Sequence, residues 1–209
     1  MNMELEHLLP AEIEKRSFEI ITEELKARSL NQEHELIIKR AIHTTADFDY
    51  ADNLCFSENV VTKALQALRT GADIVTDTQM AKAGINKRIL AKYGGEVHCF
   101  IADEDVASEA KRRATTRSAI SMEKAAKLNK KLIFAIGNAP TALIKLYEML
   151  QEGVVNPELI IGVPVGFVNV VQSKELIMQT QVPYIVARGR KGGSNVAAAI
   201  CNALLYQME

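Results

Sequence analysis

Tryptophan is absent from this chain, and aromatic residues make up only 5% of its 209 positions. With so few rings, a surface that stacks the bases of single-stranded nucleic acid is not expected. Positive charge is not in excess either, because 25 Lys and Arg residues stand against 26 Asp and Glu residues. Nucleic-acid-binding proteins usually carry a basic surplus, so the composition predicts no nucleic-acid partner.

Cysteine and long apolar stretches are scarce too. Cys55, Cys99 and Cys201 are odd in number and widely spaced, which argues against a disulfide framework and a zinc knuckle. The longest apolar run, residues 159–168, is interrupted by glycine and proline and is shorter than the roughly 20 residues of a membrane helix. The first residues, MNMELEHLLP, lack the basic start of a signal peptide. We therefore expect a cytoplasmic protein with no membrane contact.

Short runs rich in Ile and Val alternate with amphipathic segments along most of the chain. Such runs are typical of parallel strands that are buried on both faces. The predicted strands are residues 54–56, 73–76, 97–102, 132–136, 159–163 and 183–187. Their alternation with helices predicts an α/β fold, with a mostly parallel central sheet flanked by helices in a Rossmann-like three-layer arrangement and with helices at the N-terminus. Because no linker or repeat interrupts the pattern, residues 1–209 are predicted to form a single domain.

Several helix ends carry sequence signals. Ser57 is a favourable N-cap for a helix that Gly71 would end, and Pro140 suits the first turn of a helix that Gly153 would end. The last helix is expected to begin near Ser194.

Ligands of open α/β sheets bind in the loops at the carboxyl ends of the strands. Four loops follow predicted strands in this chain: residues 76–80, 137–140, 162–169 and 188–193. The last of them is rich in glycine and basic residues and precedes a helix, a position suited to an anion, although a solvated charged turn is the alternative. The candidate substrate contacts in these loops are Asp77, Gly137, Asn138, Arg188 and Arg190.

A second group of candidates lies in the N-terminal part of the chain. The first predicted helix places Ser17 on its apolar stripe, and the second places Arg40 and His43 on one face. An arginine on a partly apolar face usually has an anionic partner, and a histidine beside it can transfer protons. Plainer interpretations stay open: His43 can be a helix-end residue stabilised by the helix dipole, and Ser17 can simply pack. Arg40 can extend to water or pair with Glu33 or Glu35.

Familiar catalytic motifs are missing from the sequence. The chain has no P-loop, no G-x-G-x-x-G after a strand and no G-x-S-x-G elbow. Its four histidines are too scattered for a metal triad, so no metal ligands are predicted. Arg112, Arg113 and Arg117 lie close to a predicted helix start, where a solvated charged face is the favoured interpretation.

Several longer motifs follow one another from about residue 16 to about residue 205. They are HTTADFDYADNLCFS from His43, TDTQM from Thr76, TRSA from Thr116, FAIGNAPTAL from Phe134, LIIGVPVGFVNVVQSKE from Leu159 and VARGRKGGSN from Val186. In these motifs the chain resembles the precorrin-8 methylmutases of cobalamin biosynthesis. GNAPTAL and IGVPVGF are much more specific than a generic glycine-rich loop.

The resemblance implies an isomerase that moves a methyl group from C-11 to C-12 of precorrin-8 or cobalt-precorrin-8, giving hydrogenobyrinate or cobyrinate. It implies no cofactor, since any cobalt is carried by the substrate, and a homodimer whose active site lies near the subunit interface. Matched to the family, His43 is the proton donor and acceptor. Ser17, Arg40, Arg117 and Ser118 match residues that contact the corrinoid substrate.

Two other functions stay open. A non-catalytic corrinoid carrier would use the same arginines but would not need His43. A nucleotide-binding α/β enzyme would use the GNAP and GRKGG loops and would be stabilised by ATP or NAD.

Overall fold

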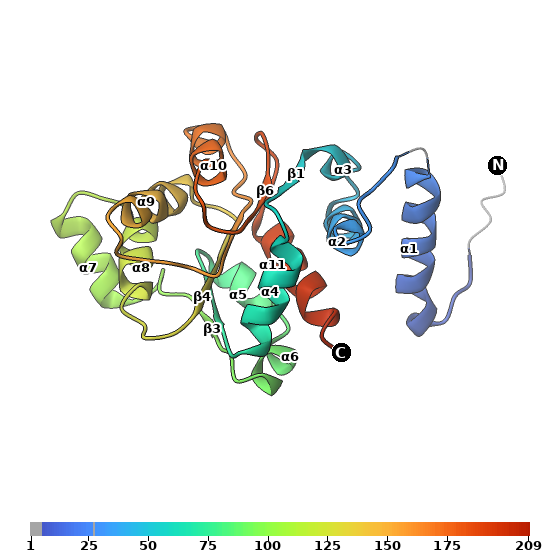
Figure 1. Ribbon diagram of the computed structural model, residues 1–209, viewed down its shortest axis with the longest axis horizontal. Coiled ribbons are helices and arrows are strands. Elements are labelled where there is room, and N and C mark those ends of the chain that lie inside the picture. The colour runs from blue at the N-terminus through green and yellow to red at the C-terminus, as the bar shows by residue number, and fades with distance from the viewer. Residues whose placement is uncertain (1–5, 27) are drawn as a thin grey trace.

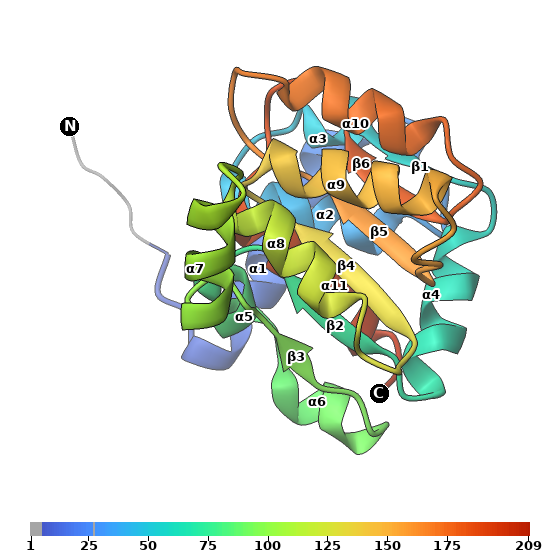
Figure 2. The ribbon, with the colours of Figure 1, turned by 90° about the vertical axis from the view of Figure 1, so that its left-hand side faces the viewer.

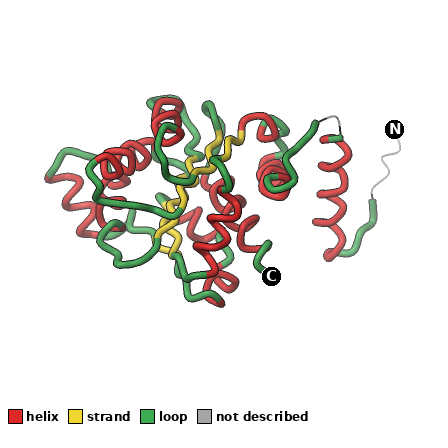
Figure 3. Tube along the Cα trace, in the orientation of Figure 1, coloured by secondary structure: helices red, strands yellow, loops and turns green. Residues whose placement is uncertain are grey.

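The computed structural model describes residues 6–26 and 28–209, and its ribbon shows a central sheet between helices (Figure 1). Figure 3 shows the strands running through the middle of the molecule, with helices around them. The strands are β1 (Leu54–Phe56), β2 (Asp73–Thr76), β3 (Val97–His98), β4 (Leu132–Ile136), β5 (Leu159–Gly162) and β6 (Tyr184–Ala187). The helices are α1 (Pro10–Leu25), α2 (Glu35–Thr45), α3 (Tyr50–Asn53), α4 (Val60–Arg69), α5 (Gln79–Gly84), α6 (Lys87–Lys92), α7 (Glu104–Arg112), α8 (Arg117–Ala125), α9 (Pro140–Gln151), α10 (Val170–Met178) and α11 (Ser194–Tyr206).

The sheet confirms the predicted α/β fold. Its strand order is β1-β6-β5-β4-β2-β3, and every neighbouring pair is parallel except β1 with β6. The central strands β4 and β5 are buried along their whole length, which explains their uninterrupted apolar sequences. Because β2, β4, β5 and β6 run in the same direction, their carboxyl ends lie at one edge of the sheet.

Helices cover both faces of this sheet, and Figure 2 shows α8, α9 and α10 in front of it. These three helices pack over Phe134, Ile160 and Val186. On the opposite face, α2, α4 and α11 pack over Ile133 and Ile161. Neighbouring residues of β4 and β5 thus point into different cores, as the two-residue period of a strand requires.

Two local predictions were wrong. β3 ends at His98, although the sequence predicts a strand to residue 102. β3 pairs with β2 alone, and β2 ends one residue beyond the last pair, so the chain after His98 has no neighbouring strand in the described sheet. Ser57 is not the N-cap of α4, because Asn59 occupies that position. The Ser57 hydroxyl instead accepts a hydrogen bond from the Tyr184 N–H at 2.9 Å.

Other helix ends agree with the sequence. α9 begins at Pro140 and α11 begins at Ser194, both as predicted. Of the helices that the structure describes, none combines the length and the apolar character needed to cross a membrane.

Helix α1 packs on α2 and is the outermost helix in Figure 1, on the side where the N-terminus lies. Ile21 and Leu25 are buried in the core that includes α2, but Ile13 and Ile20 are 53% and 39% exposed. The apolar stripe that the sequence predicts for this helix is therefore only partly covered within one chain.

Candidate active site

Asp77 joins two loops at the carboxyl ends of the parallel strands. Its carboxylate accepts hydrogen bonds from the backbone N–H groups of Gly137, Asn138 and Ala139 at 2.9, 2.8 and 2.6 Å. Asp77 is buried, and burial raises its pKa although the three N–H donors act in the opposite direction. The side chain therefore shapes the loop after β4, and its contact with substrate stays a prediction.

The loops after β2, β4, β5 and β6 also meet directly. A Cβ atom at Gly137 would lie 2.6 Å from the Cα atom of Ser194, so this close approach requires glycine. The Gly193 N–H donates to the Val163 carbonyl at 2.9 Å, and Thr78 Oγ1 lies 2.8 Å from Ser194 Oγ. The four loops thus form one continuous surface. We call residues 76–80, 137–140, 162–169 and 188–194 the carboxyl-edge surface.

The carboxyl-edge surface carries two of the predicted arginines beside exposed apolar residues. Arg188 forms an ion pair with Glu175 at 3.1 Å, and the Arg190 guanidinium lies 5.4 Å from the centre of the Phe167 ring. Phe167 is 80% exposed, and Val168 is exposed beside it. Guanidinium groups next to exposed apolar side chains suit a ligand that combines carboxylates with an apolar body.

His43 lies in the last turn of α2, at a cavity of about 260 Å³ between α2, α5 and α11. Arg40 lines the same cavity, together with Asn195 and Tyr206 of α11. The His43 side chain is exposed, and its ring stacks on Phe18 of α1 with the ring centres 5.4 Å apart. The shared helix face that the sequence predicts for Arg40 and His43 is confirmed.

Arg40 has an unusual environment. Its Cζ atom lies 4.8 Å from the ring centres of both Phe18 and Tyr206, so the guanidinium is placed between two aromatic rings. It forms an ion pair with Glu14 of α1 rather than with a glutamate near the start of its own helix. Its Nε is buried and has no hydrogen-bond partner among the described residues. Because a buried unsatisfied donor costs about 1–3 kcal/mol, an acceptor oxygen supplied here by a ligand would be favourable.

Ser17 directly precedes Phe18 on α1. Its half-buried hydroxyl donates to the Ile13 carbonyl one turn earlier, at 2.9 Å. The next residue, Phe18, contacts both Arg40 and His43. The structure therefore brings Arg40 and His43 together, whereas Ser17 does not line their cavity and its contact with substrate stays a prediction.

Two contacts connect the His43 cavity with the carboxyl-edge surface. Lys191 Nζ lies 2.6 Å from carboxylate oxygens of both Asp47 and Asp49, which follow α2. Asn195 Nδ2 donates to the Thr44 carbonyl at 3.5 Å. The loop after β6 and the end of α2 are thus joined, and the two parts of the candidate site are neighbours.

Arg117 and Ser118 begin α8. Thr116, the N-cap of this helix, donates from Oγ1 to Thr141 Oγ1 of α9 at 3.0 Å. Because α9 directly follows the loop after β4, this contact brings Arg117 and Ser118 towards the carboxyl-edge surface. Arg112 and Arg113, the other two arginines near this helix start, form surface ion pairs with Glu109 and Glu123. This agrees with the interpretation of these arginines as a solvated charged face.

Comparison with known proteins shows to which family a chain with this site belongs. A model of the family described as Precorrin-8X methylmutase matches residues 12–207. The chain belongs to this family.

Individual relatives of the precorrin-8X methylmutase family agree over nearly the full length. The cobalt-precorrin-8 methylmutase of Priestia megaterium is 46% identical over 195 residues, which cover 93% of this chain and 87% of the relative. That of Salmonella typhimurium is 47% identical over 207 residues, covering 95% and 96%. The crystal structure of precorrin-8x methyl mutase from Thermus thermophilus matches with a TM-score of 0.86 at 35% identity, over 94% of this chain and 97% of that one. The resemblance and the fold expected from the sequence are both confirmed.

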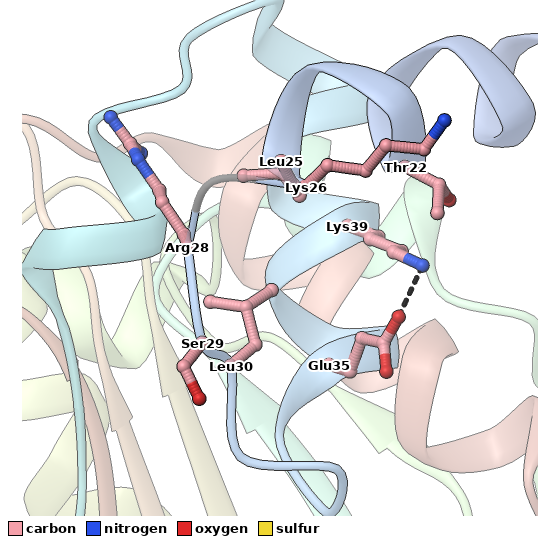
Figure 4. Close-up of a pocket in the computed structure, with 8 residues that line it drawn as sticks. All are labelled: Thr22, Leu25, Lys26, Arg28, Ser29, Leu30, Glu35 and Lys39. Carbon is pink, nitrogen blue, oxygen red and sulfur yellow. Dashed lines mark ion pairs between the residues drawn. The ribbon is translucent and has the colours of Figure 1, made fainter.

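A second cavity, of about 330 Å³, lies between the end of α1 and the start of α2 (Figure 4). Its basic side chains already have partners, because Lys39 pairs with Glu35 and Arg28 donates to the Phe48 carbonyl at 2.7 Å. Its lining includes none of the residues that match the methylmutase motifs. The cavity beside His43 is therefore the better candidate for this member of the family.

Sequence reasoning missed two kinds of site residue in this methylmutase. The Tyr206 ring packs against the Arg40 guanidinium. The sequence of α11 could have indicated Tyr206, because Asn195, Asn202 and Tyr206 recur at helical spacing on one face. Lys174 of α10 is buried and binds the loop after β6. Helical spacing could have indicated its burial, since Lys174 lies four residues after Val170 and three before Ile177 on one face of α10.

Proposed function

We propose that this chain moves a methyl group from C-11 to C-12 of cobalt-precorrin-8 or precorrin-8, giving cobyrinate or hydrogenobyrinate, and so acts as an isomerase of cobalamin biosynthesis. Family membership supports this reaction, as do two relatives described as cobalt-precorrin-8 methylmutases. The observation that carries the proposal is the meeting of His43 and Arg40 at one cavity that adjoins the carboxyl-edge surface.

The chemistry of the substrate suits these two surfaces. The macrocycle carries several carboxylates around an apolar ring system, and arginine forks bind carboxylates in two-pronged geometry. Phe167 and Val168 offer apolar contacts for the ring. The buried Arg40 Nε is a donor that a substrate carboxylate would satisfy. The proposed substrate contacts are Ser17, Arg40, Asp77, Arg117, Ser118, Gly137, Asn138, Arg188 and Arg190.

His43 is the proposed proton donor and acceptor. A proton lent by its imidazole to the π-system of the macrocycle localises charge and lowers the barrier to methyl migration. The same nitrogen takes the proton back, so the product is an isomer of the substrate and no proton is consumed. The protein supplies no cofactor in this scheme, and any cobalt belongs to the substrate. We place the reaction in the cytoplasm, because all three cysteines lie in the described residues as free thiols.

Substrate carrying ¹³C in the C-11 methyl group tests the reaction directly. We expect a product of unchanged mass and shifted absorbance, with the labelled methyl on C-12. Recovery of unchanged ligand after denaturation would favour a corrinoid carrier instead. Parallel assays with the cobalt-containing and metal-free substrates compare their kcat/KM values. Thermal stabilisation by ATP or NAD would favour the nucleotide-binding alternative.

We also propose that two copies pair and complete the site near their interface. The cavity beside His43, about 260 Å³, is smaller than the roughly 300–1,000 Å³ of sites for drug-sized ligands, and the macrocycle is larger than those ligands. Ile13 and Ile20, seven residues apart on α1, share one face and are exposed. A second copy that covers this face would bury both residues and add walls to the site.

Replacing Ile13 and Ile20 together with Asp is expected to convert a dimer into a monomer, because both charges would have to be buried at the interface. Light scattering should report a mass that falls from twice 23.1 kDa to the mass of one chain, and turnover should fall with it. Val154→Asp is the matched control, since Val154 is 57% exposed but follows α9. A wild-type chain that is fully active as a monomer would contradict the proposal.

A further inference from the structure

Lys174 of α10 is a charged side chain in the protein interior. Its exposure is 0%, and Nζ donates to the carbonyl oxygens of Gly189 at 2.7 Å and Lys191 at 2.8 Å. Burial lowers the pKa of this ammonium group to about 8. Lysine is seldom buried without partners, because removing its charge from water is costly. The hydrogen bonds to the two carbonyl groups therefore offset part of the cost of burying this ammonium group.

Charged groups close to Lys174 in the sequence and in the loop are engaged with other partners. Glu175, the next residue of α10, pairs with Arg188, and Lys191 pairs with the two aspartates after α2. Within the part of the chain that the structure describes, backbone carbonyls rather than a carboxylate hold the Lys174 ammonium.

Both carbonyls belong to the basic loop after β6. Gly189 has φ of +84°, a conformation that favours glycine, so the backbone turns sharply where Lys174 binds it. Arg190 lies between the two bonded residues and is exposed, and Arg188 precedes them. Lys174 thus holds the backbone on both sides of Arg190 from the inner side of the loop.

We propose that Lys174 is a positioning residue for the methylmutase reaction: by binding the Gly189 and Lys191 carbonyls, it holds Arg188 and Arg190 where they meet carboxylates of the macrocycle. The inference rests on the proposed function, because it takes the macrocycle as the ligand of this loop. Lys174 itself is buried and does not touch the substrate. An ammonium group suits the task because its donors can serve two carbonyls at once.

Lys174→Met tests the proposal in kinetics, because methionine keeps an unbranched apolar side chain and removes the donors. We expect KM for the macrocycle to rise by about 10- to 100-fold, the range for loss of hydrogen bonds to a charged group, whereas kcat changes much less. Lys145→Met is the matched control. Lys145 is a partly buried lysine of α9 that pairs with Glu148, so its loss should leave KM unchanged.

Hydrogen–deuterium exchange over residues 188–193 supplies a measurement that needs no substrate. We expect faster exchange in Lys174→Met than in the wild type or in Lys145→Met. Unchanged exchange in Lys174→Met would overturn the proposal. If the wild type converts neither macrocycle, the proposed function fails, and faster exchange in Lys174→Met would still show that Lys174 orders the loop.

Conservative variants separate the donor role from mere packing. Lys174→Arg keeps charged donors and is expected to have a KM closer to the wild type than Lys174→Met. If thermal denaturation shows that Lys174→Met does not fold, Lys174→Leu, which also lacks hydrogen-bond donors, takes its place in both measurements. A KM raised equally in Lys174→Arg and in the donor-free variant would contradict the proposed donor role.

Discussion

Replacing His43 with alanine is expected to lower kcat by about 10²–10⁴-fold, the usual contribution of a general acid or base. The fold should survive, because this side chain is exposed in the last turn of α2 and its main contact is a stack on Phe18 at 5.4 Å. KM should change much less, since Arg40 and the arginines of the carboxyl-edge surface remain. The absorbance change from substrate to product measures kcat, and thermal denaturation checks the fold.

His7→Ala is the matched control for this experiment, because His7 is also exposed but does not line the cavity. It should leave kcat unchanged. His43→Asn keeps a polar side chain that cannot deliver a proton, so it should lose about as much activity as alanine. Near-normal turnover in His43→Ala would mean that the macrocycle rearranges without this imidazole, and would leave His43 with a role in binding alone.

Gly137→Ala is expected to lower the free energy of unfolding by about 1–3 kcal/mol and to raise KM for the substrate. The added Cβ would lie 2.6 Å from Ser194 Cα and 2.7 Å from Gly193 O. These are backbone atoms that cannot rotate away, so the loops after β4 and β6 would have to separate. Such a shift would also disturb the hydrogen bonds that the Asp77 carboxylate accepts from the N–H groups of this loop. Urea denaturation measures the loss of stability, and steady-state kinetics measures KM.

Gly162→Ala provides the comparison at the end of the neighbouring strand. Gly162 is also buried, but a Cβ there would meet the side-chain methyl groups of Val186 and Leu143 at 3.3 and 3.4 Å. Side chains can give way by a few tenths of an ångström, so the loss should be smaller than at Gly137. Equal losses at both positions would refute the claim that backbone contact between the loops is the cause.

The fold was predictable to the extent that each strand carries its own signal. β4 and β5 are buried on both faces, so their residues are uniformly apolar and the sequence predicts them well. The end of β3 was not predictable, because residues 99–102 have strand-like composition but no neighbouring strand to pair with. Pairing is a property of the whole sheet, which a local window of sequence does not contain.

The candidate site was predictable in the same limited way. Helical periodicity places Arg40 and His43 on one face, and the structure confirms this placement. The partner of Arg40 could not be predicted, because Glu14 is 26 residues away on a different helix. The Asp77 carboxylate points inward because it binds N–H groups of the loop after β4. The burial of Lys174 depends on carbonyl groups of the loop after β6. These are tertiary contacts between segments far apart in the chain.

The two margins of the sheet are very short: β1 has three residues and β3 has two. Few unpaired N–H and C=O groups are therefore offered to a foreign strand, which protects the chain from edge-to-edge aggregation. The proposed pairing of two copies would instead use helical surfaces, where side chains pack without any exchange of backbone hydrogen bonds. A dimer joined in that way would separate and re-form without refolding of either chain, so dilution alone should raise the fraction of monomer.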